Sequence, residues 1–329
     1  MRGLIESPLQ ITSDADMPNP TGNETPRLMD PSNEDRQKRR ERTEKIVFAL
    51  LTFLTYCIIA PIVLLVGYLL YKGITGLSWN FITSLPEKNL TAGGIWPAVV
   101  GTVYLVIGTV TISLPLGVLA AIYLNEYASQ GFWTRSIRLA VVNLSGVPSI
   151  IFGLFGLSLF VIGIALPFNI TLFGFGKSVI AGALTLAIMV LPLIITTTEN
   201  ALRAVPISFR EASLGLGATK WQTLWRAVLP SALPGILTGL VLAVGRAAGE
   251  TAPILFTAAV LDQTRIPGIF DVAQPVMALP YHLYMVALFL PGAPDDLKWR
   301  TAVVLVTIVL AFNASALIIR SYYRRKQQW

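Results

Sequence analysis

Long apolar stretches alternate with short polar connections along most of this chain. Six stretches come near or exceed the ~20 apolar residues that cross the hydrocarbon core of a bilayer. They cover residues 46–71, 95–124, 139–166, 178–198, 233–261 and 301–319. Only the fifth contains charged side chains, Arg246 and Glu250. The pattern predicts an all-α integral membrane protein in which residues 46–320 form one domain of six transmembrane helices.

The two ends of the chain are polar. Residues 1–45 are rich in proline and poor in apolar side chains, which predicts a disordered tail. The tail lacks the apolar core of a cleaved signal peptide. It ends in the basic run 36–42, directly before the first span. This run is interpreted either as a site for anionic lipid or a partner, or as a plain topological anchor, and the anchor is favoured. Residues 321–329 form a second basic tail.

Composition and charge agree with a membrane protein. Hydrophobic residues make up 54% of the chain and charged residues only 13%, against about 25% charged in soluble domains. Of the 25 Lys and Arg residues, 18 lie in segments that are cytoplasmic if the N-terminus is inside, and six lie in the outer segments. Because positive charge accumulates on the cytoplasmic side, both termini are predicted inside. The basic balance therefore reflects topology rather than nucleic-acid binding.

The cytoplasmic segment 199–232, between the fourth and fifth spans, has two helix-start patterns. Ser208 to Glu211 reads S-x-x-E and Thr219 to Gln222 reads T-x-x-Q, the form of a capping box. Gly215 and Gly217 between them can adopt positive φ and open a turn. The segment is predicted to form two short helices. By physics alone they are either a docking element or an ordinary helix pair anchored at the membrane surface by tryptophans.

The sequence E-A-S-L-G-L-G-A-T-K-W from Glu211, closed by Val228-Leu229-Pro230, resembles the "EAA" loop of ABC importer permeases. Ser213 departs from that pattern by one hydroxyl. The resemblance implies a type I ABC importer permease fold and a loop that docks on a separate ATPase subunit. It assigns the coupling role to Glu211, Ala212, Gly217, Ala218, Lys220 and Trp221.

The fifth span contains the remaining chemistry. Charge at membrane depth is costly unless it is paired or lines a wet cavity. At ~100° per residue, Arg246 and Glu250 fall on one helix face together with Gly235, Gly239, Leu242, Gly249 and Pro253. That face is predicted to point into the protein. The pair is interpreted either as a structural i, i+4 ion pair or as a substrate contact, since guanidinium matches oxyanions in bidentate fashion.

No catalytic centre is predicted in this chain. Gly176-Lys177-Ser178 invites a nucleotide-binding interpretation, but the P-loop pattern requires glycine where Thr171 stands. The one histidine, His282, and the one cysteine, Cys57, are far apart in the sequence, so no metal site is expected.

Three further motifs resemble phosphate-importer permeases of the PstA type, in the expected order. They are Y-L-N-E-Y from Tyr123, V-P-S-I-I-F-G-L-F-G from Val147 and G-R-A-A-G-E-T-A-P from Gly245. The resemblance implies import of inorganic phosphate across the inner membrane by alternating access. It also implies a PstC-like second permease subunit, a PstB-like ATPase dimer that binds ATP and Mg²⁺, and a PstS-like phosphate-binding protein.

Two other function classes stay open at this stage. A type I permease for another anion or small solute would keep the EAA-like loop without requiring an arginine at position 246. A secondary transporter or channel would work without an ATPase on the loop and would favour inverted repeats. The sequence leaves open the role of residues 262–298 with His282, and whether the permease pair is a homodimer or a heterodimer.

Overall fold

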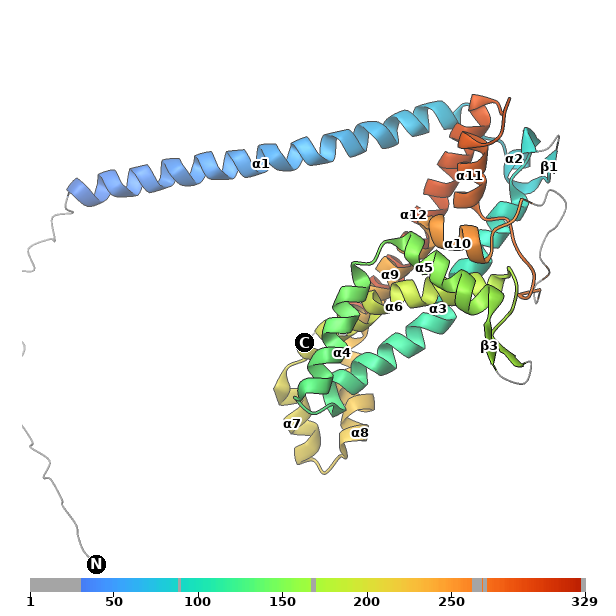
Figure 1. Ribbon diagram of the computed structural model, residues 1–329. Coiled ribbons are helices and arrows are strands. Elements are labelled where there is room, and N and C mark those ends of the chain that lie inside the picture. Colours follow the sequence, from blue (N-terminus) through green and yellow to red (C-terminus); the bar gives the residue numbers. More distant parts are fainter. Residues whose placement is uncertain (1–30, 88–89, 167–169, 262–267, 269–270, 327–329) are drawn as a thin grey trace, which may run out of the picture. The chain divides into compact units, whose positions relative to one another are not determined.

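The computed structural model describes residues 31–87, 90–166, 170–261, 268 and 271–326 (Figure 1). It divides into two units, residues 1–64 and 65–329. In the first unit, the described residues belong to helix α1 (Pro31–Ile74), which continues into the second. The expectation of disorder up to residue 45 is therefore wrong from Pro31 onward. After that proline the basic run contains neither Gly nor Pro, and its Glu, Lys and Arg residues extend the helix of the first span.

The second unit consists of helices and two short hairpins. The hairpins pair antiparallel strands: β1 (Pro86–Glu87) with β2 (Ala92–Gly93), and β3 (Ile164–Leu166) with β4 (Ile170–Leu172). The α-helices are α2 (Trp79–Thr83), α3 (Trp96–Ile122), α4 (Phe132–Ser145), α5 (Ser149–Gly156), α6 (Val179–Ala204), α7 (Ile207–Gly215), α8 (Lys220–Thr223), α9 (Leu229–Gly249), α10 (Ala252–Thr257), α11 (Leu279–Leu288) and α12 (Asp295–Lys326). Short π-helical segments are η2 (Tyr123–Tyr127), η3 (Leu157–Ile162) and η4 (Leu224–Val228).

Among the described residues, five helices are long and apolar enough to cross a membrane, and a sixth span forms if a bent pair is counted as one. That pair replaces the continuous third span predicted over 139–166. It joins Phe132–Ser145 to Ser149–Ile162 at an angle of 104°. The break falls at Pro148, which lacks the backbone N–H and disfavours helix in the residue before it. The prediction of an all-α membrane protein is confirmed.

Helix α6 lies at the centre of the second unit. Its side chains Leu186, Val190 and Ile194 are fully buried, and they belong to one apolar cluster with residues of α3, α5, α9 and α10. Small residues allow the closest packing: a Cβ atom at Gly235 of α9 would lie 2.4 Å from that of Ala201. The predicted approach of helices at these glycines is confirmed where α9 crosses α6.

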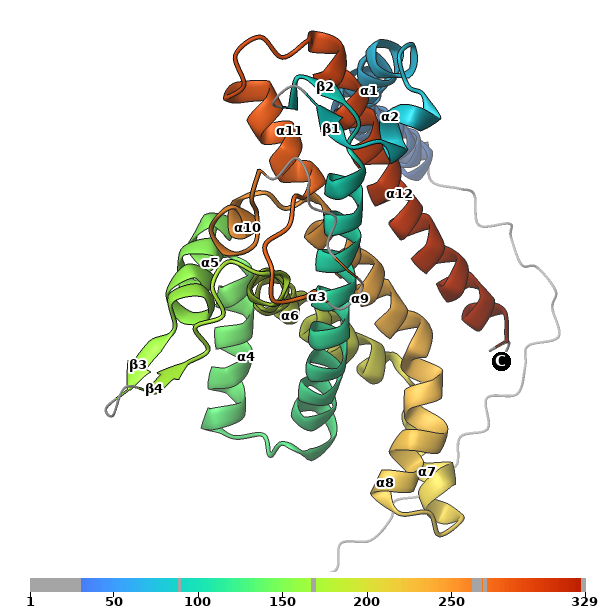
Figure 2. The ribbon, with the colours of Figure 1, turned by 90° about the vertical axis from the view of Figure 1, so that its right-hand side faces the viewer.

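Several of the segments predicted on opposite sides of the membrane lie at opposite ends of the second unit. Figure 2 shows the α3–α4 connection and α7–α8 at one end, and α2, β1, β2 and α11 at the other. Part of the unassigned stretch 262–298 is now defined. The Val272 and Gln274 carbonyls accept hydrogen bonds from Ile180 and Val179, so they satisfy N–H groups that the start of α6 leaves unpaired. The stretch continues into α11.

Candidate functional site

The cytoplasmic loop folds into two short helices joined by a tight turn, as predicted. Gly217 has φ of +84°, a conformation that favours glycine. Thr219 and Gln222 form the predicted capping box. The other two local predictions are wrong: α7 begins after Pro206 without a side-chain cap, so Ser208 is not a cap, and Gly215 is the last residue of α7 with no positive φ. Proline before Ile207 already fixes the helix entry.

The side of this loop that faces away from the spans is exposed. Helix α7 has no buried residue, and Leu216 and Trp221 are 90% and 57% exposed. These apolar side chains are therefore accessible to a partner or to the membrane surface. The hydroxyl of Ser213, the departure from the family pattern, lies 2.9 Å from the Thr223 hydroxyl and joins α7 to the end of α8.

All six predicted coupling residues lie on this small element. Glu211 and Ala212 are on the exposed side of α7. Gly217 and Ala218 form the turn, and Lys220 and Trp221 open α8. The fold therefore brings together the residues that the sequence pattern singled out.

The charged pair of the fifth span lies at a break in the helix. Helix α9 ends at Gly249, and Glu250 caps it in an extended conformation. The Arg246 Nε atom lies 3.4 Å from Glu250 Oε1, and the two side chains are 36% and 19% exposed. A continuous fifth span to residue 261 is therefore wrong, because α10 starts anew after Thr251.

The two halves of the α9 face that was predicted to point inward have different surroundings. Gly235 and Gly239 pack against α6. Nearer the break, Leu242 is 50% exposed and nothing in the described chain approaches a Cβ at Gly249. Within the described residues, the half that includes Arg246 is partly exposed. That this half faces the interior of the transporter rather than lipid stays a prediction.

Two motifs that are distant in sequence meet at this break. Helix α5, from the stretch that begins at Val147, packs on α10. A Cβ atom at Gly153 would lie 2.9 Å from the Ala252 carbonyl oxygen, so only glycine permits this approach. The stretch beginning at Val147 therefore supports the backbone directly after Arg246 and Glu250.

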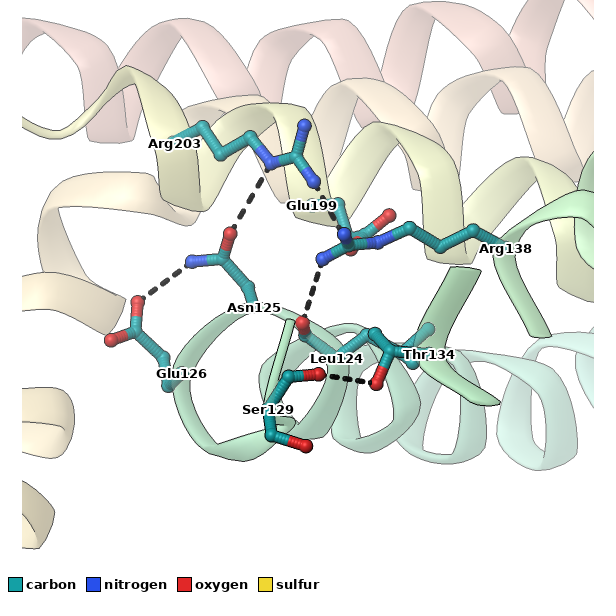
Figure 3. Close-up of polar contacts among 8 residues, drawn as sticks. All are labelled: Leu124, Asn125, Glu126, Ser129, Thr134, Arg138, Glu199 and Arg203. Carbon is teal, nitrogen blue, oxygen red and sulfur yellow. Dashed lines mark hydrogen bonds and ion pairs between the residues drawn. The ribbon is translucent and has the colours of Figure 1, made fainter. Parts of the chain in front are cut away.

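Sequence analysis missed two features. The His282 ring is buried, and neither ring nitrogen has a hydrogen-bond partner among the described residues. Burial lowers the pKa of His282 to about 4. The second feature is a cluster of ion pairs at the cytoplasmic ends of α3, α4 and α6 (Figure 3). Their spacing in the sequence, such as 61 residues between Arg138 and Glu199, gave no signal.

No metal centre is assigned. Within the described ranges, no three His, Cys, Asp or Glu side chains gather as a metal site would require.

Comparison with known proteins gives several relatives. The family described as "Binding-protein-dependent transport system inner membrane component" matches residues 113–328. The probable ABC transporter permease protein YqgI of Bacillus subtilis is 34% identical over 84% of this chain and 95% of its own. The phosphate transport system permease protein PstA of Haemophilus influenzae is 35% identical over 79% of this chain and 86% of its own. PstA 1 of Mycobacterium tuberculosis is 33% identical over 88% and 91%.

Solved structures support the same fold. A chain of a bacterial ABC transporter involved in the import of the acidic polysaccharide alginate aligns with a TM-score of 0.57 at 15% identity, covering 89% of this chain and 100% of that one. A chain of the inward-facing MetNI methionine ABC transporter aligns with a TM-score of 0.50 at 19% identity, over 70% and 94%. With the family match over most of the transmembrane region, the chain belongs to the inner membrane components of binding-protein-dependent transport systems, the permease subunits of ABC importers.

Proposed function

We propose that this permease moves inorganic phosphate inward across the inner membrane. The observation that carries the proposal is the open position of Arg246 at the break between α9 and α10. Its guanidinium has five N–H donors. Within the described part of the chain, it has one long contact, to Glu250 at 3.4 Å. The remaining donors are available to a tetrahedral oxyanion.

The surroundings of Arg246 favour weak, transient binding of an anion over tight binding. Glu250 is close enough to neutralise part of the charge. A neutralised arginine attracts an oxyanion less strongly than an isolated one, and release on the other side is then faster. The side chain is 36% exposed, which agrees with a water-accessible pathway better than with a sealed structural pair.

Transport requires partners. A PstC-like permease subunit would complete the pathway beside the open half of α9. A PstS-like protein would deliver phosphate from outside. A PstB-like ATPase dimer would dock on Glu211 to Trp221 and bind ATP and Mg²⁺, so this chain needs no catalytic residue and no cofactor of its own. ATP-driven closure of the ATPases would open the spans outward, and hydrolysis would reset them.

The relatives support phosphate as the substrate. PstA proteins of several bacteria are 30–35% identical to this chain over most of its length. The name of the YqgI relative specifies no substrate. The alternative is therefore a type I permease for another anion or small solute.

The test is uptake by the complete complex in proteoliposomes with the binding protein outside and ATP inside. Labelled phosphate is expected to accumulate only with ATP, and excess unlabelled phosphate is expected to compete while sulfate does not. ATP-dependent uptake of sulfate, or of an uncharged solute, with no phosphate uptake would overturn the substrate assignment. Phosphate uptake without ATP would favour a secondary transporter or channel.

A further inference from the structure

Helix α7, the first helix of the docking loop, is attached to the spans by an arginine that the family-like motifs do not single out. Arg210 lies directly before Glu211, and its side chain is only 20% exposed although α7 has no buried residue. Successive helical residues point ~100° apart. Glu211 therefore lies on the exposed surface of the loop, whereas Arg210 points toward the ends of the spans.

The guanidinium of Arg210 reaches two spans at once. Nη1 donates to the Val205 carbonyl and Nη2 to the Leu202 carbonyl, each at 2.9 Å. These carbonyls lie at the end of α6, where the helix leaves acceptors unpaired. Nη2 also donates to Glu126 Oε1 at 2.9 Å. Glu126 belongs to η2, the continuation of α3, so one side chain ties α7 to both α3 and α6.

The span ends that Arg210 contacts are themselves joined (Figure 3). Arg138 of α4 donates to Glu199 of α6 at 3.0 Å and to the Leu124 carbonyl of η2 at 2.8 Å. Asn125 fixes the Glu126 carboxylate with a 2.8 Å hydrogen bond. Charge-assisted bonds of this kind are about twice as strong as neutral ones. The ends of α3, α4 and α6 therefore form one polar unit.

We propose that Arg210 is the positioning residue that makes the docking loop move together with the ends of α3 and α6, with Glu126 as its anionic partner. This inference rests on the proposed function, since it assumes an ATPase that acts on the loop. Displacement of α7 is transmitted through three short bonds to two spans. Without Arg210, α7 keeps its contact with α8 through Ser213, but it loses these bonds to α3 and α6.

The experiment measures anion uptake and ATP hydrolysis in the same reconstituted complex and takes their ratio. Arg210→Ala is expected to assemble, dock its ATPase and hydrolyse ATP, while uptake per ATP falls about tenfold, the size of a typical coupling between sites. Glu126→Gln and Arg210→Lys are expected to give smaller falls. If the two residues act as one link, Arg210→Ala/Glu126→Gln is no worse than Arg210→Ala.

The matched control is Arg135→Ala. Arg135 lies on α4 near the same end, its side chain is exposed, and it forms no ion pair within the described ranges. Its uptake per ATP is expected to match the wild type. If Arg210→Ala does not assemble, Arg210→Lys and Glu126→Gln, which preserve side-chain volume, decide the question.

Wild-type uptake per ATP in all three Arg210 and Glu126 variants would overturn the inference. So would variants that form less assembled complex but show a normal uptake per ATP in the complex that does form. The ratio is taken with whichever anion the wild-type complex transports. A wrong substrate assignment is therefore detected as absent phosphate uptake by the wild-type complex. A wrong role for Arg210 is detected only in the uptake per ATP of its variants.

Discussion

Two arginines of this permease occupy opposite kinds of environment. Arg210, under the docking loop, donates to three acceptors at 2.9 Å. Arg246, at the break between α9 and α10, has within the described residues a single contact of 3.4 Å. Arg210 lies near water, where leaving donors unpaired costs little, yet it donates three short hydrogen bonds. Arg246 lies in a transmembrane segment, where unpaired donors cost most, yet it is largely free.

The comparison suits the two proposed roles, a positioning arginine at 210 and a substrate contact at 246. A side chain that donates several short hydrogen bonds inside the chain positions elements, as Arg210 does. A side chain left with unused donors in a costly place is retained for something that the isolated chain does not contain. A passing oxyanion or a second permease subunit would meet that need.

The largest effect on transport is expected from substitutions of Arg246, and they test its contrast with Arg210 directly. Arg246→Lys keeps the charge but loses the planar fork, and Arg246→Gln loses both. If the arginine binds phosphate in passage, uptake is expected to fall in both variants, on the order of a hundredfold for Gln and less for Lys. Uptake in proteoliposomes checks this. Near-normal uptake by Arg246→Gln would contradict the assignment.

The docking loop gives the next largest effect. Gly217→Asp places a side chain at φ of +84°, which strains the turn by about 1–3 kcal/mol, and adds a charge to the surface proposed to dock the ATPase. Uptake and ATPase binding are expected to fall while membrane insertion persists. Gly215→Asp is the control, because it adds the same charge at an exposed position with no positive φ. Equal behaviour of both variants would show that the turn does not matter.

The His282 ring supplies another test, because it is buried and has no hydrogen-bond partner among the described residues. Burial favours the neutral form and lowers the pKa of His282 from 6.5 to about 4. Stability is therefore complete above pH 6.5 and falls as the pH drops toward 4, because the unfolded chain binds a proton that the folded chain does not. The loss approaches about 3 kcal/mol.

Thermal unfolding in detergent between pH 7 and pH 4.5 measures this loss. His282→Leu replaces the ring by an apolar side chain and is expected to remove that part of the acid sensitivity. An unchanged pH dependence in His282→Leu would show that other groups cause it.

The smallest effect concerns the start of α8. Thr219→Ala removes a capping box that the structure contains, at a cost of about 1 kcal/mol. Faster amide hydrogen exchange at Gln222 reports the loss. Ser208→Ala is the matched control, since Ser208 lies inside α7 after the Pro206 cap and its exchange pattern is expected to stay the same.

Local patterns predicted part of the local structure of the loop. The capping box at Thr219 and the turn at Gly217 depend on neighbours in sequence, and both are confirmed. Pro148 lies inside the predicted third span, but apolar periodicity alone could not distinguish a continuous span from a 104° bend. That bend depends on how α5 packs against α10 through Gly153, which is a tertiary contact.

The surroundings of charged residues were harder to predict from the sequence. Arg246 and Glu250 were identified because charges in a span are rare. The end of α9 at Gly249 was not, because the apolar stretch continues past it to residue 261. The bond between Arg210 and Glu126 joins residues 84 positions apart, and no spacing rule predicts such a pair.

The most direct test of the account is phosphate uptake by the double variant Arg246→Gln/Glu250→Gln, measured on assembled complex beside each single variant. The double variant leaves no carboxylate stranded in the span, so any cost of a broken ion pair disappears. If Arg246 contacts phosphate, the double variant is present, assembled and still inactive. If the two residues form only a structural pair, the double variant recovers uptake that Arg246→Gln has lost, and that result would contradict the account.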